Sequence, residues 1–280
     1  MIGSLQTGIS GLDQFQQDLE VIGNNIANVN TTGFKSARMD FQDTFSQSLL
    51  KSIPSQIGTG VATGGIDTMF TQGTINGTGV ATDLAIQGPG FFVVKNTSTG
   101  QNFVTRDGTF QVDANGYLVT NQQYRVQGYS GAGPYTSASP VGDLQITAGS
   151  AITALGDTTV PAPTLAQFSI DSAGQINATL SDNKAGVIGQ VVLQNFAAPQ
   201  HLIKDGGNLY TFDATAGSLG TGAPSTSGMG TIQAQALESS NVDLAAEMAA
   251  LITAQRAFEA NAKVITTSDE VLQAVNNLKH

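Results

Sequence analysis

Apolar side chains recur at alternating steps of three and four residues near the start of the chain. Positions 5, 8, 12, 15, 19, 22, 26 and 29 follow this spacing, and Gly8 is the one exception to their apolar character. Such spacing is typical of an amphipathic helix with a coiled-coil seam. It predicts a helix over about residues 4–28 that ends in the turn-forming run 28–33. The apolar seam residues are Leu5, Leu12, Phe15, Leu19, Ile22, Ile26 and Val29.

The last forty residues repeat the pattern. Ser240 and Asp243 are candidate N-terminal caps, and no Gly or Pro interrupts residues 241–280. A helix of about 36 residues would be roughly 54 Å long. Because its seam cannot be covered from within, it most simply pairs with the first helix. The predicted seam consists of Leu244, Met248, Leu251, Gln255, Phe258, Ala262, Ile265, Asp269, Leu272 and Asn276.

Short alternating runs separated by turns fill the chain between the helices. Residues 110–118 and 168–176 share the pattern Phe-x-aliphatic-Asp-x-x-Gly-x-aliphatic, which predicts two hairpins with the same turn. The run Phe91–Val94 predicts a buried strand. We therefore predict an α+β protein with a mainly antiparallel β-domain at 66–230, inserted into a helical domain of residues 1–33 and 238–280. Residues 34–65 are expected to be a bridging linker, and 130–163 a surface excursion.

The charge and composition exclude several classes of partner. The net charge is −10 with only 11 Lys and Arg, and these form no basic stripe, so nucleic acid is not an expected partner. There is no Cys for disulfides or thiol chemistry. No apolar run is long enough to span a membrane, and the N-terminus lacks the pattern of a cleavable signal. We expect no membrane insertion, and residence in the cytoplasm or export by a dedicated machine.

The sequence offers little for catalysis. Its two histidines are His201 and His280, and no paired carboxylates, phosphate loop or metal-ligand cluster are recognisable. We therefore expect no enzymatic activity, cofactor or metal site. Residues 113–116 indicate a hairpin turn rather than a calcium loop. Arg256, beside the seam, lies within reach of Glu259 or of a carboxylate on a neighbouring chain; a surface arginine of small energetic weight is the alternative.

Two long motifs carry a family resemblance. Residues 24–35 (NNIANVNTTGFK) and residues 237–261, with LESSNVDL, EM and QRAFEAN, resemble the signatures of the bacterial flagellar rod and hook proteins. Residues 83–86, 90–92 and 105–110 also match. The resemblance covers the whole chain except 130–163.

The resemblance implies a helical tube built from many copies. The paired terminal helices would form the inner wall around an export channel, the β-domain would form the outer layer, and the segment after Phe34 would bridge them. The implied partners are further copies of the chain, adjacent rod or hook–filament junction proteins, the hook cap and the flagellar type III export apparatus. The implied location is the flagellum, in the hook or basal body, on the extracellular side. The assembly residues expected from seam and resemblance together are the apolar seam positions named above with Asn25, Phe34, Gln255 and Arg256.

Within this family, two readings remain. Residues 126–129 (VQGY) resemble hook subunits, and this favours a flexible joint that transmits torque. The alternative is the distal rod, a rigid drive shaft, because the chain is short and lacks large outer domains between its hairpins. From other classes, a secreted enzyme that cuts cell-wall glycan would need Asp107, Asp113 or Asp171 in a cleft. An adhesin on a helical stalk would need a receptor patch in 130–163.

Overall fold

A computed structural model describes residues 2–44, 46–48, 56–131, 135, 140–147, 165–226 and 228–277. The chain divides into two compact units. The first, here called the helical unit, comprises Met1–Val29, Lys35–Met69 and Val242–His280. The second, here called the β-unit, comprises Asn30–Phe34 and Phe70–Asn241. The predicted surface excursion at 130–163 lies mostly outside the described residues.

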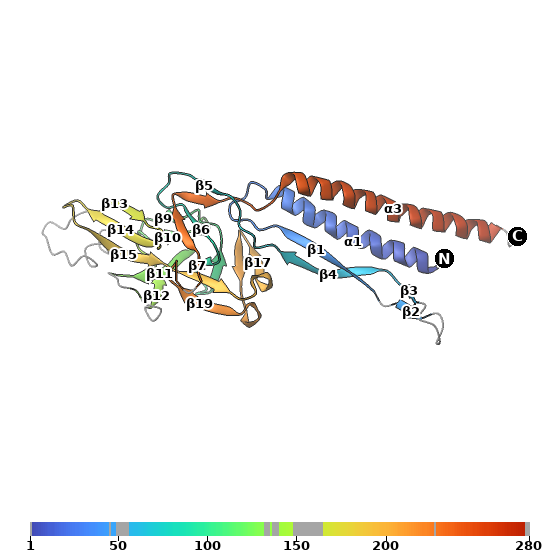
Figure 1. The fold of residues 1–280 in the computed structure, drawn as a ribbon, viewed down its shortest axis with the longest axis horizontal. Helices are drawn as coiled ribbons and strands as arrows, with labels where there is room; N and C mark the ends of the chain where they lie inside the picture. Colours follow the sequence, from blue (N-terminus) through green and yellow to red (C-terminus); the bar gives the residue numbers. More distant parts are fainter. Residues whose placement is uncertain are drawn as a thin grey trace. The chain divides into compact units, whose positions relative to one another are not determined.

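The helical unit contains the two predicted terminal helices. Helix α1 (Ile2–Ala27) lies beside helix α3 (Leu244–Asn277), as Figure 1 shows in blue and red. Asp243 caps α3, since its Oδ1 accepts a hydrogen bond from the Ala245 N–H at 2.9 Å. The pairing of N- and C-terminal helices around an inserted antiparallel β-region is therefore confirmed.

A β-hairpin also packs on α1. Strands β1 (Ala37–Asp43) and β4 (Val61–Thr68) pair antiparallel, and β2 (Ser46–Ser48) pairs with β3 (Gln56–Gly58). Ser10 Oγ accepts a bond from the Val61 N–H at 3.3 Å, and the Phe15 and Phe41 ring centroids are 5.5 Å apart. The residues expected to be a bare linker thus form most of a paired ribbon, because pairing satisfies the backbone groups of a Gly-rich segment.

The helix–helix seam follows a register that differs from the predicted one. Of the predicted α3 positions, Leu251, Phe258, Ala262 and Ile265 are partly buried, but Leu244 and Met248 are each 44 % exposed. Gln255, Asp269 and Leu272 are exposed as well, whereas Ala254 is only 3 % exposed. The seam therefore keeps the predicted positions Leu251, Phe258 and Ile265, and between them it includes Glu247 in place of Met248 and Ala254 in place of Gln255.

Small residues explain this register. A Cβ added to Gly11 would lie 2.8 Å from Asn261 Nδ2, and one added to Gly8 would lie 3.2 Å from Ile265 Cγ1. The two helices thus approach closely where α1 presents glycine, and Asn261 and Ile265 of α3 fill this space. On α1, Ile22 and Asn25 are buried, while Leu5, Leu12, Phe15, Leu19, Ile26 and Val29 are partly buried.

The β-unit is built around one large antiparallel sheet. Its strands lie in the order β13-β14-β15-β11-β7-β8-β18-β17, with β9, β10, β12, β16 and β19 attached beside this path. Two short pairs, β20 with β6 and β21 with β5, lie apart from it. The bounds along the chain are β5 Ile75–Gly77, β6 Leu84–Gln87, β7 Phe91–Lys95, β8 Asn102–Thr105, β9 Gln111–Val112, β10 Leu118–Val119, β11 Arg125–Ser130, β12 Val141–Asp143, β13 Leu165–Ile170, β14 Gln175–Leu180, β15 Ala185–Val191, β16 Leu193–Phe196, η1 Pro199–His201, β17 Ile203–Gly206, β18 Leu209–Thr211, η2 Ala214–Ala216, β19 Ser218–Gly222, β20 Thr231–Ala234 and β21 Ala236–Glu238.

Strand β7 is buried on both faces, as the run Phe91–Val94 predicts. Phe92 and Val94 enter the larger hydrophobic cluster, and Phe91 and Val93 enter the smaller one on the other face. The two repeated motifs form the predicted hairpins, β9 with β10 and β13 with β14. In each turn the aspartate Oδ1 accepts two backbone N–H bonds: Asp113 from Asn115 and Tyr117, and Asp171 from Ala173 and Gln175. Both aspartates are therefore occupied as turn caps.

Candidate functional site

Two segments that are far apart in the sequence meet within the β-unit. The Gly33 N–H donates to the Glu238 carbonyl oxygen at 2.7 Å, and the Asn241 N–H donates to the Phe34 carbonyl at 3.4 Å. Gly33 has φ +65°, and a Cβ there would lie 2.7 Å from the Arg106 carbonyl carbon. Only glycine fits both this backbone conformation and this close approach. The β-unit therefore begins and ends at one place, which we call the clamp (residues 30–34, 106 and 236–241).

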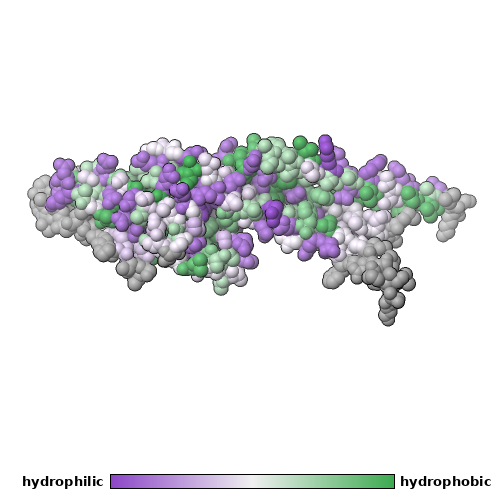
Figure 2. Space-filling model, in the orientation of Figure 1, coloured by the Kyte–Doolittle hydropathy of each residue, from purple (hydrophilic) through white to green (hydrophobic). Residues whose placement is uncertain are grey.

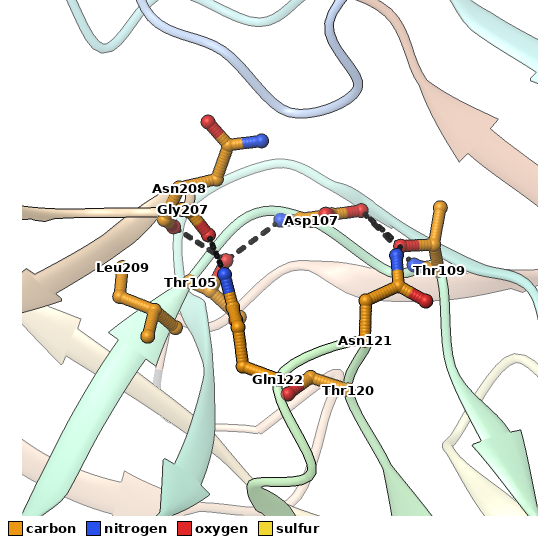
Figure 3. Close-up of a pocket in the computed structure, with 9 residues that line it drawn as sticks. All are labelled: Thr105, Asp107, Thr109, Thr120, Asn121, Gln122, Gly207, Asn208 and Leu209. Atoms are coloured by element: carbon orange, nitrogen blue, oxygen red, sulfur yellow. Dashed lines mark hydrogen bonds between the residues drawn. The ribbon is translucent and has the colours of Figure 1, made fainter.

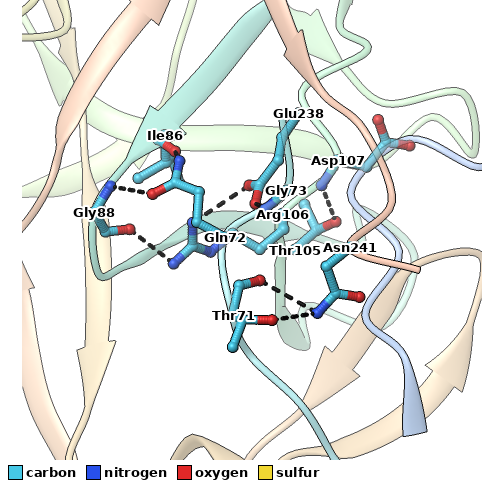
Figure 4. Close-up of polar contacts among 10 residues, drawn as sticks. All are labelled: Thr71, Gln72, Gly73, Ile86, Gly88, Thr105, Arg106, Asp107, Glu238 and Asn241. Carbon is cyan, nitrogen blue, oxygen red and sulfur yellow. Dashed lines mark hydrogen bonds and ion pairs between the residues drawn. The ribbon is translucent and has the colours of Figure 1, made fainter. Parts of the chain in front are cut away.

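A buried ion pair lies at the centre of the clamp (Figure 4). Arg106 is 5 % exposed and Glu238 is fully buried, and Nη1 of the arginine lies 3.3 Å from Oε2 of the glutamate. Nη2 donates to the Gly88 carbonyl at 2.9 Å, and the Gly73 N–H donates to Glu238 Oε1 at 2.9 Å. The guanidinium lies 5.1 Å from the Phe91 ring centroid. Burial lowers the pKa of Arg106, and the charge of Glu238 opposes this fall.

Neutral hydrogen bonds extend the clamp on both sides. Gln72 Nε2 donates to the Ile86 carbonyl at 2.6 Å, and Gln72 Oε1 accepts from the Gly88 N–H at 2.8 Å (Figure 4). Asn241 Nδ2 donates to Thr71 Oγ1 at 2.8 Å. Phe34, predicted as a bridging residue, is buried within the β-unit, and Lys204 Nζ lies 5.0 Å from its ring centroid. The role of the clamp is structural, because its charged side chains, Arg106 and Glu238, bind each other.

A polar pocket of about 220 Å³ lies beside the clamp (Figure 3). Gln122 Nε2 donates to the Gly207 carbonyl at 3.1 Å, and Thr105 Oγ1 donates to the Asn208 carbonyl at 2.7 Å. Asp107 Oδ1 accepts from the Thr109 N–H at 3.0 Å. Asp107 is the sole carboxylate among the lining residues, so the pocket lacks a general acid–base pair. The lining residues are Thr105, Asp107, Thr109, Thr120, Asn121, Gln122, Gly207, Asn208 and Leu209.

Asp107 should make the stability of the β-unit depend on pH. Burial raises the pKa of Asp107 above its ordinary value, and hydrogen bonds from Thr109 oppose the rise. A raised folded-state pKa gives a contribution to stability that is complete below the unfolded value of about 3.9 and is lost as the pH rises through the folded value. We expect Asp107→Asn to remove this loss of stability with rising pH. Urea unfolding of both proteins from about pH 3.5 to pH 7 tests this; a variant-to-wild-type difference that stays constant with pH would contradict it.

A buried amide ties three elements of the helical unit together. Asn25 Nδ2 donates to the Ala37 carbonyl of β1 at 2.8 Å and to Glu247 Oε1 of α3 at 3.1 Å. Asn25 Oδ1 accepts from the Ala37 N–H at 2.9 Å. Burial raises the pKa of Glu247, and the bond from Asn25 opposes this rise. Asn25, expected as an assembly residue, is thus a joint within one subunit.

Asn25→Ala should destabilise the helical unit by about 1–3 kcal/mol, because it leaves buried groups of Ala37 without partners. The matched control is Asn24→Ala, since Asn24 is an exposed neighbour on the same helix. Thermal unfolding followed by far-ultraviolet circular dichroism at 222 nm would measure both. Equal melting temperatures for the two variants would show that the hydrogen bonds of Asn25 to β1 and α3 do not stabilise the helical unit.

The sequence alone assigned no roles to Arg106, Glu238 or Gly33. Arg106 and Glu238 lie in the motifs at 105–110 and 237–244. The feature that could have indicated them is a charged residue within an otherwise buried run. Asp107, Asp113 and Asp171 do not converge, since two of them cap separate turns. Among the described residues, no group of three His, Cys, Asp or Glu is placed to hold a metal ion. No helix in this part of the chain is long and apolar enough to cross a membrane.

Exposed apolar side chains line α3. Leu244, Met248 and Ile252 stand four residues apart near its start, and Val271 and Val275 near its end. Figure 2 shows green surface at both places along α3. Helix α3 has 34 residues and α1 has 26, so the last turns of α3 extend past the seam. Contiguous apolar surface of this kind marks interaction sites.

These features define a structural subunit: paired terminal helices, an inserted β-unit closed by a clamp, and apolar surface left on the longer helix. Comparisons agree. A family model described as the FlgEFG basal body rod C-terminal region matches residues 233–278, the FlgE/F/G hook D1 domain matches 85–178, and the basal body rod protein model matches 5–35. The chain belongs to the flagellar rod and hook protein family.

The individual relatives include both rod and hook proteins. The chain is 38 % identical to the basal-body rod protein FlgG of Bacillus subtilis over all of both chains, and 33 % identical to that of Borreliella burgdorferi over 100 % and 99 %. The hook protein FlgE of Treponema pallidum is 43 % identical over 57 % of this chain and 38 % of its own. A solved Helicobacter pylori hook protein FlgE2 aligns with TM-score 0.45 at 10 % identity over 59 % of this chain and all of that one. The relatives thus favour the rod alternative over the hook.

Proposed function

We propose that this chain is a distal rod subunit of the flagellar basal body, a copy of a rigid tube that transmits rotation. The main support is the length of the matches: the alignments cover 100 % and 99 % of two rod proteins but only 38 % of a hook protein. The hook-like run Val126–Tyr129 lies in β11 and is buried, and a Cβ on Gly128 would overlap the Gln190 carbonyl. Packing explains this run, so it does not favour the hook.

In this proposal the helical unit lines the export channel and the β-unit forms the outer layer. The partners are further copies, the adjacent rod and hook subunits and the type III export apparatus. The exposed apolar residues of α3 support this reading, because a tube supplies the neighbours that cover them. The protein works as a shaft and performs no catalysis.

Electron microscopy of the purified chain under polymerising conditions tests the proposal. We expect straight tubes, and gold-labelled antibody against the chain should bind the rod of isolated basal bodies. Curved tubes together with label on the hook would instead establish the hook reading. Absence of any tube, with label outside the flagellum, would overturn both readings.

A chain that ends at Ala260 should keep a folded β-unit and form no tubes. Residues 261–280 belong to the helical unit, and their removal takes away the Asn261 and Ile265 contacts with α1. The near-ultraviolet circular dichroism of the tyrosines, none of which lies in the helical unit, should be unchanged. Tubes of normal length from this truncated chain would contradict the role of α3.

A further inference from the structure

The carboxylate of Asp107 lines the polar pocket without a cation beside it. It forms no ion pair with any residue that the structure describes, and its neighbour in the chain, Arg106, binds Glu238 instead. Burial raises the pKa of Asp107, and its strongest charge–charge influence, from the like charge of Asp83, raises the pKa further. A carboxylate taken partly out of water usually has a cationic partner, because its desolvation is costly. Asp107 therefore lacks the partner that its surroundings favour.

The size and the lining of the pocket indicate which cations fit. The lining residues come from three segments, 105–109 after β8, 120–122 before β11 and 207–209 at the start of β18, and none of them is basic (Figure 3). The volume of about 220 Å³ lies below the roughly 300–1,000 Å³ of pockets for drug-sized ligands, so the occupant is a small group. No lining residue is aromatic, whereas quaternary ammonium groups are typically bound by aromatic cages. Leu209 is the sole apolar lining residue, and it offers a surface for methylene groups next to a charged head.

The hydrogen bonds of Asp107 favour a primary ammonium group over a guanidinium. Thr109 donates its N–H at 3.0 Å and its hydroxyl at 2.9 Å, both to Oδ1, and the Asn208 amide is a further donor near the carboxylate. A carboxylate accepts about four hydrogen bonds, so at least one position is left on Oδ2. A guanidinium binds best as a fork that takes both oxygens, whereas an ammonium group concentrates three donors on a point charge. Gln122 Oε1, which accepts no hydrogen bond from a described residue, is a second acceptor in the pocket.

We propose that this pocket binds a primary alkylammonium group, such as the head of a lysine side chain or of a free amine. Asp107 Oδ2 binds the charge, Gln122 Oε1 accepts a second N–H, and the methylene groups beside the ammonium lie against Leu209. Occupation supplies the missing partner of Asp107 and links the three segments that line the pocket. The proposal concerns the β-unit alone, so it holds whether or not the chain is a rod subunit.

Isothermal titration calorimetry of the full chain with n-butylammonium chloride, at about pH 7 and constant ionic strength, tests the proposal. We expect saturable binding at a single site, and binding at least about tenfold weaker for ethylguanidinium and tetramethylammonium, which carry the same charge. Asp107→Asn should weaken butylammonium binding at least about tenfold, because it removes a charge-assisted hydrogen bond. The control is Asp13→Asn, which removes the same charge from an exposed position of the helical unit and should bind as wild type does.

The affinity for butylammonium should also depend on pH. Protonation of Asp107 removes the charge that binds the ammonium group, so binding should weaken as the pH falls. Because burial and the nearby Asp83 raise the pKa of Asp107, this weakening begins at a higher pH than for an ordinary aspartate, whose pKa is about 3.9. Titrations between about pH 4 and pH 7 measure the change. An affinity that stays constant over this range would exclude Asp107 as the binding group.

Gln122→Lys provides a second test that leaves Asp107 in place. Gln122 is exposed, so the fold should tolerate the substitution. The ammonium group of the new side chain should occupy the pocket, abolish butylammonium binding and raise the melting temperature of the β-unit, and the rise should be absent when Asp107→Asn is added. Gln122→Met, of similar length and without charge, is the control and should keep most of the binding. If both variants bind butylammonium equally and melt at the same temperature, the proposal fails.

The ligands also distinguish the sources of the ammonium group. A short capped peptide with one lysine that binds as tightly as butylammonium would support a protein side chain as the occupant, and binding of the free amine alone would support a small molecule. Binding of K⁺ as tight as that of butylammonium, or no saturable binding of any amine, would overturn the proposal. Neither of these last two results bears on the rod function, which the tube assay tests separately.

Discussion

Glu238→Ala will lower the free energy of unfolding of the β-unit by about 3–5 kcal/mol. Glu238 is fully buried, and its loss leaves the Arg106 guanidinium uncompensated in an apolar setting. The Gly73 N–H also loses its acceptor. Arg106 Nε already has no hydrogen-bond partner, so after the loss of Glu238 the guanidinium would keep the bond from Nη2 to the neutral Gly88 carbonyl. Breaking such a pair costs far more than the pair contributes relative to an apolar replacement.

Urea unfolding of the full chain, followed by near-ultraviolet circular dichroism of its tyrosines, measures this effect. The control is Lys184→Ala, whose partner Asp182 lies 3.5 Å away, with side chains that are 51 % and 28 % exposed, and we expect a loss below about 1 kcal/mol. The double variant Arg106→Met/Glu238→Leu should recover most of the lost stability, since it removes both charges. If Glu238→Ala unfolded at the same urea concentration as the wild type, the Arg106–Glu238 pair would not stabilise the β-unit.

Gly108→Ala will also destabilise the β-unit, by at least about 3 kcal/mol. A Cβ at this position would overlap the Leu84 carbonyl oxygen and lie 2.7 Å from its carbonyl carbon. Both atoms belong to the backbone, so neither can rotate aside as a side chain would. Moving Gly108 would break the bonds that its carbonyl accepts from the Leu84 N–H at 3.1 Å and the Phe110 N–H at 2.9 Å. The cost is purely steric, since φ here is not in the left-handed region.

Gly142→Ala is the matched control for this prediction. Gly142 lies in β12, and no atom stands within 4 Å of the Cβ it would gain. We expect a change within about 0.5 kcal/mol of zero for this variant. The same urea titration compares the two alanines. Similar urea unfolding midpoints for the two variants would show that the backbone around Leu84 moves to admit the added Cβ at little cost in stability.

The helices and hairpins could be predicted because their signals are local. Steps of three and four residues indicate the two helices, and Asp followed three residues later by Gly indicates the β9–β10 and β13–β14 turns. The seam register could not be predicted, because α3 has apolar residues on two sides. Leu244 and Met248 continue the apparent repeat, but both are 44 % exposed, whereas Ala254 is 3 % exposed.

The clamp was hidden for a different reason. Arg106 and Glu238 are 132 residues apart, and the sequence around either residue does not indicate that it pairs with the other. The β1–β4 ribbon was equally obscure, since β1 has no β-branched residue and Gly64 and Gly65 interrupt β4. The motifs at 24–35 and 237–261 indicated the family, and comparison along the full length favoured the rod over the hook.

The meeting of both ends of the β-unit at Gly33 and Glu238 has a mechanical consequence. The β-unit has four covalent connections to the rest of the chain, because it consists of Asn30–Phe34 and Phe70–Asn241. Tension between the first and the last of them, at Asn30 and Asn241, reaches the Gly33–Glu238 and Asn241–Phe34 hydrogen bonds before it reaches the large sheet. The strands are shielded from pulling forces along that path, so the β-unit could keep its shape while these two connections are strained repeatedly.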